Sequence, residues 1–308
     1  MENILISTSS FGRYDEALIE DLMNSELKIT FNPYGRELKE NEIKELLNGV
    51  EGLIAGTEPL TRDVINSAKD LKVISRCGIG IDNIDIETAK SRGIKLYRTL
   101  EGPALAVAEL TMGLMIDSLR HISYLSRKIR SGEWEKRMGR LLTGKTVGIV
   151  GMGTIGKKLV TLMRSFDCNV LATDHMVDVE FAKENKFEFV EMKELLRDSD
   201  IVTLHLPLNN DTKGLFDTNS FMQMKEGAIF INTSRGKIVD ENALFEALRC
   251  GKIGHACLDV FSNEPYVGKL KELDNVTLTC HVGSYAREAR VAMERQAVKN
   301  LLKGLTGS

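Results

Sequence analysis

The sequence lacks several patterns that would assign a protein to a class at once. Its five cysteines (Cys77, Cys168, Cys250, Cys257 and Cys280) form no C-x-x-C pair, so neither a disulfide framework nor a structural zinc site is expected. Most of them are expected to be small, buried hydrophobic side chains. The five histidines have no metal-ligand spacing such as H-x-x-x-H, so no metal site is predicted.

A charge excess of one sign and long apolar runs are also missing. The 41 Lys and Arg residues against 44 Asp and Glu residues leave a net charge of −3, which argues against a nucleic-acid-binding protein. No uncharged stretch approaches the roughly 18 residues of a membrane span, and the N-terminus has no basic and apolar leader. The chain is therefore expected to be cytoplasmic and to bind neither nucleic acid nor a membrane.

What the sequence does contain is a regular alternation of short apolar runs and amphipathic segments, which is typical of parallel strands joined by helices. At about 150 residues per domain, 308 residues favour two domains. In the first block, strands are expected at residues 4–8, 28–31, 52–55, 73–75 and 94–97, and helices at 16–23, 38–47, 64–68 and 87–91.

A second block follows one long helix, which is expected from residue 103 to residue 129 and ends at 131–134. About six strands are expected in this block, at 146–150, 170–173, 201–206, 228–232, 256–260 and 276–280. Its helices are expected at 155–166, 192–198, 220–224 and 241–249, and a last helix at 288–302. Two α/β domains with doubly wound parallel sheets are predicted.

The strongest local signal is the turn Gly151-Met-Gly153-Thr-Ile-Gly156, which follows an expected strand and opens an expected helix. Gly151 allows the tight turn, Gly153 allows close approach of a pyrophosphate, and Gly156 allows the helix to pack on the strand. The next strand ends in Asp174, 23 positions after Gly151. A carboxylate there accepts ribose hydroxyls and repels a 2′-phosphate, and no Arg follows it, so NAD is favoured over NADP.

Three polar residues follow later expected strands, at the sheet edge where parallel α/β proteins bind ligands. They are Arg235, Glu264 and His281. Arg can grip a carboxylate in two places, His titrates near neutrality and can move a proton, and a carboxylate can stabilise an imidazolium. Taken singly, each residue also has an ordinary structural interpretation: Arg235 as a surface charge, Glu264 as a loop acid and His281 as a core histidine.

Taken with other motifs, these residues resemble those of the D-isomer-specific 2-hydroxyacid dehydrogenases, most closely the D-3-phosphoglycerate dehydrogenase branch. The matching stretches are Ser75-Arg-Cys-Gly-Ile-Gly-Ile-Asp-Asn-Ile-Asp85, Ala106-Val-Ala-Glu-Leu110, the glycine turn, His205-Leu-Pro207, Asn232-Thr-Ser-Arg-Gly236, Leu258-Asp-Val-Phe with Glu264-Pro265, and Thr279-Cys-His-Val-Gly283. They cover nearly the whole chain in family order.

The resemblance implies roles for particular residues. Arg235 would bind the substrate carboxylate, His281 would be the acid/base, and Glu264 would hydrogen-bond its far nitrogen. NAD contacts would come from the glycine turn with Thr154 and Ile155, and from Asp174, Leu206, Thr212, Thr233, Ser234, Arg235, Asp259, His281, Gly283 and Ser284. Substrate contacts would come from Arg76, Cys77, Gly78 and Ile79, together with Arg235 and His281.

The same resemblance implies a Rossmann-type NAD domain, residues 101–283, inserted into a flavodoxin-like substrate domain, residues 1–100 and 284–308. The active-site cleft would lie between the two domains, and a homodimer would form through the long helix. The expected activity is NAD-dependent oxidation of a D-2-hydroxy acid, with 3-phosphoglycerate to 3-phosphohydroxypyruvate, in serine biosynthesis, as the leading reaction.

Other substrates stay open: glycerate or hydroxypyruvate, glyoxylate, and lactate-type acids. The loop after the third strand reads Ala55-Gly-Thr-Glu58-Pro59, where many phosphoglycerate dehydrogenases have an Arg that helps bind phosphate, and an acid does not serve that purpose. Lys136 or Arg137 of a second subunit are alternative sources of positive charge. A different class, an NAD-sensing corepressor that binds peptides, has the same fold and would turn over small oxo acids poorly.

Overall fold

In the computed structural model, which describes residues 1–306, the chain divides into two compact units. Unit 1 comprises residues 1–103 and 285–308, and unit 2 comprises residues 104–284, so that unit 2 is inserted into unit 1 along the sequence. All strand pairings in both units are parallel. Each unit therefore has its own doubly wound sheet, as the alternation of elements predicts.

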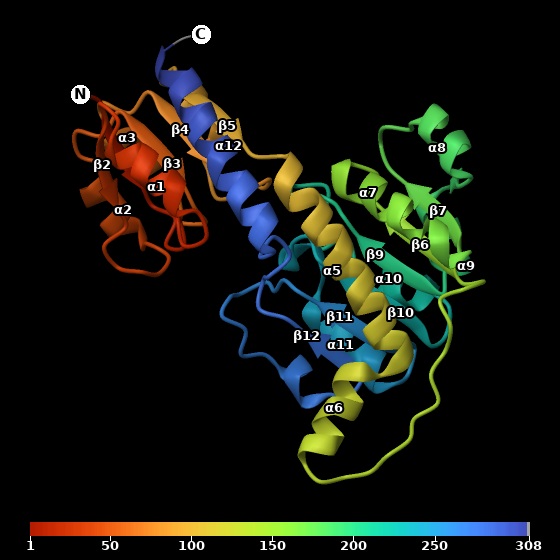
Figure 1. Ribbon diagram of the computed structural model, residues 1–308. Coiled ribbons are helices and arrows are strands. Elements are labelled where there is room, and N and C mark those ends of the chain that lie inside the picture. The colour runs from red at the N-terminus through yellow and green to blue at the C-terminus, as the bar shows by residue number, and fades with distance from the viewer. Residues whose placement is uncertain (307–308) are drawn as a thin grey trace. The chain divides into compact units, whose positions relative to one another are not determined.

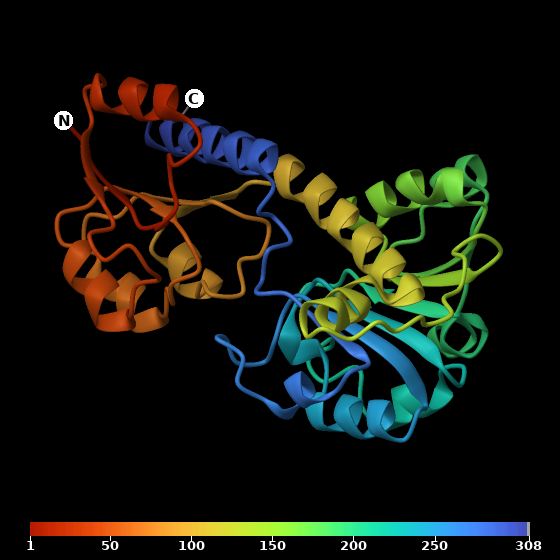
Figure 2. The same cartoon turned by 60° about the horizontal axis from the view of Figure 1, so that its bottom comes forward.

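Unit 1 contains a five-stranded sheet in the order β2-β1-β3-β4-β5. Its strands are β1 (Asn3–Ile6), β2 (Lys28–Phe31), β3 (Gly52–Ala55), β4 (Val73–Arg76) and β5 (Lys95–Arg98). Its helices are α1 (Glu16–Met23), α2 (Glu40–Leu46), α3 (Arg62–Ser67), α4 (Ile86–Ser91) and α12 (Arg287–Thr306). Neighbouring residues of β1 point to opposite faces, since Leu5 packs with residues of α2 and α3 and Ile6 packs with residues of α1 and α12. The ribbon in Figure 2 shows helices on both faces of this sheet.

Unit 2 contains a seven-stranded sheet in the order β12-β11-β10-β9-β6-β7-β8 (Figure 1). Its strands are β6 (Thr146–Val150), β7 (Asn169–Thr173), β8 (Glu188–Phe189), β9 (Ile201–Leu204), β10 (Ala228–Asn232), β11 (Ile253–Leu258) and β12 (Val276–Leu278). Its helices are α7 (Thr154–Met163), α8 (Val179–Asn185), α9 (Met192–Asp198), α10 (Thr218–Gln223) and α11 (Glu241–Arg249). Short 3₁₀ turns lie at Arg164–Phe166, Gly236–Ile238 and Lys269–Glu272.

The expected single helix over residues 103–129 is wrong, because the structure has α5 (Glu101–Arg120) and α6 (Ile122–Arg130) instead. His121 between them has a left-handed backbone, with φ of 56°. The amide of Ser123 donates to Oδ1 of Asp117 at 2.6 Å, and the carbonyl of Leu119 accepts from the amide of Arg140 at 2.9 Å. These two bonds replace helical ones at the break.

Two further expectations need correction. Unit 2 has seven strands rather than about six, because the two-residue edge strand β8 and the helix α8 before it carry too little apolar periodicity to be recognised. Of the cysteines, only Cys77 and Cys257 are buried, while Cys250 and Cys280 are exposed. Among the described residues, Gly102–Arg120 is long and apolar enough to cross a membrane, but 67% of it is buried in the structure, as in core helices that meet the same criterion.

Candidate active site

The glycine turn joins β6 to α7 in unit 2, and each of its glycines has a distinct surrounding. Gly151 has φ of +99°, and a Cβ there would lie 2.6 Å from the carbonyl oxygen of His205. A Cβ on Gly156 would lie 2.4 Å from the carbonyl oxygen of Gly151, so helix and strand are packed too closely for any other residue. Around Gly153 the space is open, with no other atom within 4 Å of a Cβ position. Of these three glycines, Gly153 is therefore the one whose backbone a ligand can approach closely.

This surrounding fits a dinucleotide phosphate. The first turn of α7 follows Gly153 and has no side-chain cap, so its amides remain available to an anion. Next to it lies a cavity of about 950 Å³, which is lined by Met152, Gly153, Thr154, Lys157 and Asp174 among others. The residues present are thus those that would hold the pyrophosphate and the adenosine ribose of NAD.

Asp174 follows β7 and is bonded to the glycine turn itself. Its Oδ2 accepts from the amide of Met152 at 2.6 Å, and its Oδ1 accepts from the amide of Met176 at 2.9 Å. These bonds hold the carboxylate beside the cavity, and each oxygen keeps capacity for a ribose hydroxyl. Sequence reasoning missed Lys157 and Lys158, which line the same cavity, although Lys157 forms an ion pair with Asp178.

The other predicted cofactor residues follow the carboxyl ends of neighbouring strands. Leu206 and Thr212 lie after β9, Thr233 and Ser234 after β10, Asp259 after β11, and Gly283 and Ser284 after β12. Some of these side chains form hydrogen bonds within their own loops. Ser234 donates from Oγ to Asn232 Oδ1 at 2.8 Å, and Thr212 donates from Oγ1 to the carbonyl of Pro207 at 2.7 Å. The parallel sheet thus brings together residues that are more than 100 positions apart in sequence.

Arg235 belongs to a loop that packs closely against the loop of Glu264. A Cβ on Gly236 would lie 1.9 Å from the carbonyl carbon of Phe261, so only glycine allows the two loops to touch. The side chain of Asn232 donates to the carbonyl of Arg235 at 2.9 Å, and Arg235 Nη1 donates to the carbonyl of Ser234 at 2.7 Å. The first bond therefore holds the backbone of Arg235, and the second restrains its guanidinium.

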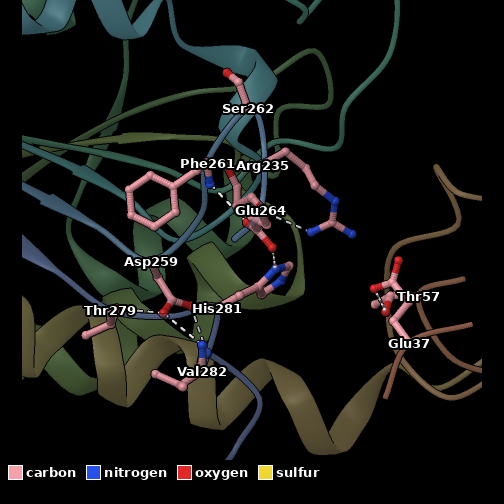
Figure 3. Close-up of polar contacts among 12 residues, drawn as sticks. Glu37, Thr57, Arg235, Asp259, Phe261, Ser262, Glu264, Thr279, His281 and Val282 are labelled. Atoms are coloured by element: carbon pink, nitrogen blue, oxygen red, sulfur yellow. Dashed lines mark hydrogen bonds and ion pairs between the residues drawn. The ribbon is translucent and has the colours of Figure 1, made fainter. Parts of the chain in front are cut away.

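His281 is bonded to Glu264 within the same unit. Its Nδ1 lies 2.8 Å from Oε2 of Glu264, and the amide of Phe261 donates to Oε1 of Glu264 at 3.0 Å. In Figure 3, Glu264 lies between the imidazole of His281 and the guanidinium of Arg235. The structure thus brings together the three residues that the sequence proposed for catalysis.

Electrostatics define the protonation of this pair. Burial raises the pKa of Glu264, but the hydrogen bonds from His281 and Phe261, with the charges of His281 and Arg235, outweigh it and lower that pKa below its usual value. Because an ionised carboxylate only accepts hydrogen bonds, Nδ1 of His281 carries the hydrogen of the shared bond. Nε2 is then the ring nitrogen that can take or give a proton.

Asp259 organises the backbone around His281, a role that sequence reasoning did not foresee. Its Oδ1 accepts from Thr279 Oγ1 at 2.6 Å and from the amide of Val282 at 2.8 Å, and its Oδ2 accepts from the amide of Gly283 at 2.8 Å. Its carbonyl accepts from the amide of His281 at 2.8 Å. His281 has a left-handed backbone, with φ of 54°, which a histidine adopts only when its surroundings hold it.

The predicted substrate loop belongs to unit 1. Arg76 ends β4 and is 8% exposed, and its Nη1 donates to the carbonyl of Cys77. Cys77 is also buried, and burial raises the pKa of its thiol to about 12, so it is not a nucleophile. Gly78 has φ of +153°, and its open α-carbon lets the guanidinium of Arg76 lie against it.

Among the described residues, no cluster of His, Cys, Asp and Glu could hold a metal ion. The glycine turn, the acid after β7 and the Arg–Glu–His group together define a dinucleotide-dependent dehydrogenase that acts on an anionic substrate. The chain belongs to the D-isomer specific 2-hydroxyacid dehydrogenase family, since the sequence model of that family's NAD binding domain matches residues 112–283. NAD is therefore its cofactor.

Comparison with individual proteins agrees with this family. The chain is 36% identical to a hydroxypyruvate reductase of Thermotoga maritima, over 94% of this chain and 95% of the relative. It is 38% identical to a D-3-phosphoglycerate dehydrogenase of Methanocaldococcus jannaschii over 87% of this chain, but spans only 52% of that longer protein. The crystal structure of TT0316 protein from Thermus thermophilus matches with a TM-score of 0.89 at 33% identity, over 99% of this chain and 97% of that one.

Proposed function

We propose that the chain interconverts a small 2-hydroxy acid, either glycolate or a three-carbon D-2-hydroxy acid, and the corresponding 2-oxo acid, with Arg235, His281 and Glu264 as the reacting group. The observation that carries this proposal is the 2.8 Å bond between His281 Nδ1 and Glu264 Oε2, beside a guanidinium on the same sheet edge. A histidine oriented by a carboxylate is suited to proton transfer, and a nearby Arg is suited to an anionic substrate.

Bound NAD supplies a hydride acceptor for carbon 2 of the hydroxy acid. Arg235 would hold the carboxylate through two parallel hydrogen bonds and would polarise the oxygen on carbon 2. His281 Nε2 would take the proton of the hydroxyl group during oxidation and would return it during reduction. Glu264 would stabilise the imidazolium that forms and would keep Nε2 pointed away from itself.

Two substrate pairs have support. The motif resemblance and the phosphoglycerate dehydrogenases among the relatives favour 3-phosphoglycerate and 3-phosphohydroxypyruvate, which would make the enzyme part of serine biosynthesis. The hydroxypyruvate reductase, which the chain matches over 95% of its length, favours the unphosphorylated pair. A structural observation also favours the second pair, because Glu58 in the loop after β3 is a buried acid.

The deciding experiment is a panel of oxo acids followed by NADH absorbance. If 3-phosphoglycerate is the substrate, 3-phosphohydroxypyruvate is reduced faster than hydroxypyruvate at low concentration, and Arg76→Ala removes most of that preference. If hydroxypyruvate or glyoxylate has the higher kcat/KM, the phosphoglycerate assignment fails and the dehydrogenase assignment stands. Poor turnover of every oxo acid, with binding of a short peptide, would instead indicate a corepressor.

We also propose a cytoplasmic homodimer. Support comes from the apolar side chains on α6 and the segment after it, which are unusually exposed in the single chain: Ile122, Ile129, Trp134, Met138 and Leu141. A second copy would cover these side chains, since patches of this kind are rarely left to water. Light scattering after size exclusion would test this, and a Trp134→Glu with Met138→Glu variant should run as a monomer.

A further inference from the structure

The segment from Phe261 to Leu270 in unit 2 leaves the hydrophobic core and returns to it, and Glu264 lies on the part outside the core. Phe261 is 8% exposed and Leu270 is 1% exposed, so both ends of the segment are buried. Between them, Glu264 is exposed and Val267 is 80% exposed. Burial does not hold a carboxylate on such a loop, so its position beside His281 depends on contacts within the loop.

Tyr266 connects the middle of this loop to the core. Its ring stacks on that of Phe261, with the ring centroids 4.2 Å apart and an angle of 23° between the planes. Its hydroxyl oxygen accepts from the amide of Leu270 at 3.1 Å. Gly268 makes this position of the ring possible, because a Cβ there would lie 2.3 Å from the hydroxyl oxygen. Tyr266 thus holds both ends of the loop, Phe261 through its ring and Leu270 through its hydroxyl group.

Phe261 is in turn the residue that connects the loop to the reacting group. Its amide donates to Oε1 of Glu264 at 3.0 Å, and Oε2 of the same carboxylate lies 2.8 Å from Nδ1 of His281 (Figure 3). Gly236, which follows Arg235, packs against the carbonyl carbon of Phe261. A change in the tilt of the Phe261 backbone therefore displaces the carboxylate relative to His281 and Arg235, the charged groups that act on it.

We propose that Tyr266 is a positioning residue for the proton transfer: its stack on Phe261 fixes the backbone that holds Glu264, and so keeps the carboxylate against Nδ1 of His281. This inference rests on the proposed function, in which His281 moves the proton, and adds to it a residue that acts through Glu264. Tyr266 itself does not titrate near neutral pH, because burial raises its pKa above the usual, already high value. An effect of Tyr266 on the pH profile therefore reports its contacts and not its ionisation.

Two variants separate the ring from the hydroxyl group. Tyr266→Ala removes the stack and should lower kcat/KM for hydroxy-acid oxidation by about two- to tenfold, the range for the loss of one aromatic pair. Its pH profile should also move toward acid, as in Glu264→Gln, because the imidazolium loses its anion. Tyr266→Phe keeps the stack and should keep the wild-type profile. Phe245→Ala is the matched control, because it removes a half-buried ring of α11 that packs against the same core, and it should leave the profile in place.

A double variant and a chemical probe exclude a general loss of structure. Because Tyr266 acts through Glu264, Tyr266→Ala combined with Glu264→Gln should stay within about twofold of the oxidation rate of Glu264→Gln alone, whereas independent damage would multiply the two losses. The side chain of His281 is 43% exposed and can be acylated by diethyl pyrocarbonate in the protein without NAD. The pH dependence of this acylation, followed by mass spectrometry of the peptide, should move toward acid in Tyr266→Ala and not in Tyr266→Phe.

The results distinguish this inference from the proposed function. A wild type that reduces no 2-oxo acid refutes the proposed function. A pH profile that moves in Glu264→Gln and not in Tyr266→Ala refutes the role of Tyr266, and so do multiplied losses in the double variant. If Tyr266→Ala does not fold, Tyr266→Leu, which keeps an apolar side chain without a ring, is judged by the same profile and the same acylation.

Discussion

His281 and Glu264 share a hydrogen bond of 2.8 Å, although 16 residues and the whole of β12 separate them in the chain. The carboxylate is held from its other oxygen by the amide of Phe261, so it cannot turn away from the imidazole. The backbone of His281 is held in turn by Asp259. A ring that is fixed on both sides presents Nε2 in one direction, which is the requirement for directed proton transfer.

Replacing Glu264 by Gln should therefore change the pH profile. The anion that stabilises the imidazolium is lost, so the pH profile of hydroxy-acid oxidation should shift toward acid. The initial rate of oxidation between pH 5 and pH 9 measures this. Glu241→Gln is the control, because Glu241 accepts from the amide of Ser262 in the same loop. A profile that does not move would mean that the pair is not formed in solution.

The low pKa of Glu264 gives this profile a second feature. The carboxylate stays ionised well below neutral pH, because its pKa is lowered by His281, Phe261 and Arg235 together. The stabilisation of the imidazolium by Glu264 is fully present above the ordinary pKa of a carboxyl group. It is lost only as the pH falls through the lowered pKa of Glu264. The wild type should thus show no loss of oxo-acid reduction that is attributable to Glu264 between pH 7 and pH 5. An acid limb in that window that disappears in Glu264→Gln would contradict this.

Arg235→Lys should be a severe change, because a point charge does not reproduce two parallel hydrogen bonds to a carboxylate. Loss of one charged hydrogen bond costs about 1.5–3 kcal/mol, so kcat/KM for the oxo acid should fall by at least about tenfold. NADH affinity, measured by fluorescence titration, should stay near the wild type. Arg249→Lys, at an exposed ion pair with Glu246, is the control. A variant that keeps more than about half of its activity would exclude Arg235 as the carboxylate anchor.

Cofactor preference should depend on Asp174. The carboxylate is fixed beside the cavity by Met152 and Met176, and Lys157, which lines the same cavity, is engaged by Asp178. NAD should therefore exceed NADP in kcat/KM by at least about tenfold, or roughly 1.4 kcal/mol. Asp174→Ala should lower the ratio of kcat/KM with NAD to kcat/KM with NADP, without changing KM for the oxo acid. The control Glu184→Gln on α8 should leave this cofactor ratio unchanged. Equal efficiency of the wild type with both cofactors would rule out this placement of Asp174.

His205 predicts an acid-dependent loss of stability. Burial lowers its pKa from 6.5 to about 3, so the folded protein keeps it neutral while the unfolded chain protonates it below pH 6.5. The contribution of neutral His205 to the free energy of unfolding is fully present above pH 6.5. It falls by about 1.4 kcal/mol per pH unit as the pH drops toward 3. Between pH 7 and pH 5, His205→Gln should lose about 2 kcal/mol less unfolding free energy than the wild type. Urea unfolding followed by circular dichroism measures this, and equal losses in both proteins would contradict it.

The fold could be predicted from sequence because its signals are local. The ranges expected for β2, β3, β6, β10, α1, α9 and α11 agree with the structure at both ends, since each combines a compact apolar pattern with a clear boundary. Local chemistry also identified the glycine turn, because a positive φ at Gly151 and the close approach at Gly156 leave no other residue type. The break at His121 escaped prediction, because the Asp117 and Arg140 bonds that stabilise it form outside the helical repeat.

The sequence by itself determined the order of strands and helices, the phosphate turn and the residue types available for chemistry. Only the tertiary structure decided what those residues do. In the sequence Glu58 is only an acid in a loop, and its burial follows from the pairing of β1 and β3, which brings Ser7 to it. His281 and Asp259 are 22 positions apart and meet because β11 and β12 are parallel neighbours. Charge, burial and protonation depend on such non-local contacts, which no local pattern of residues encodes.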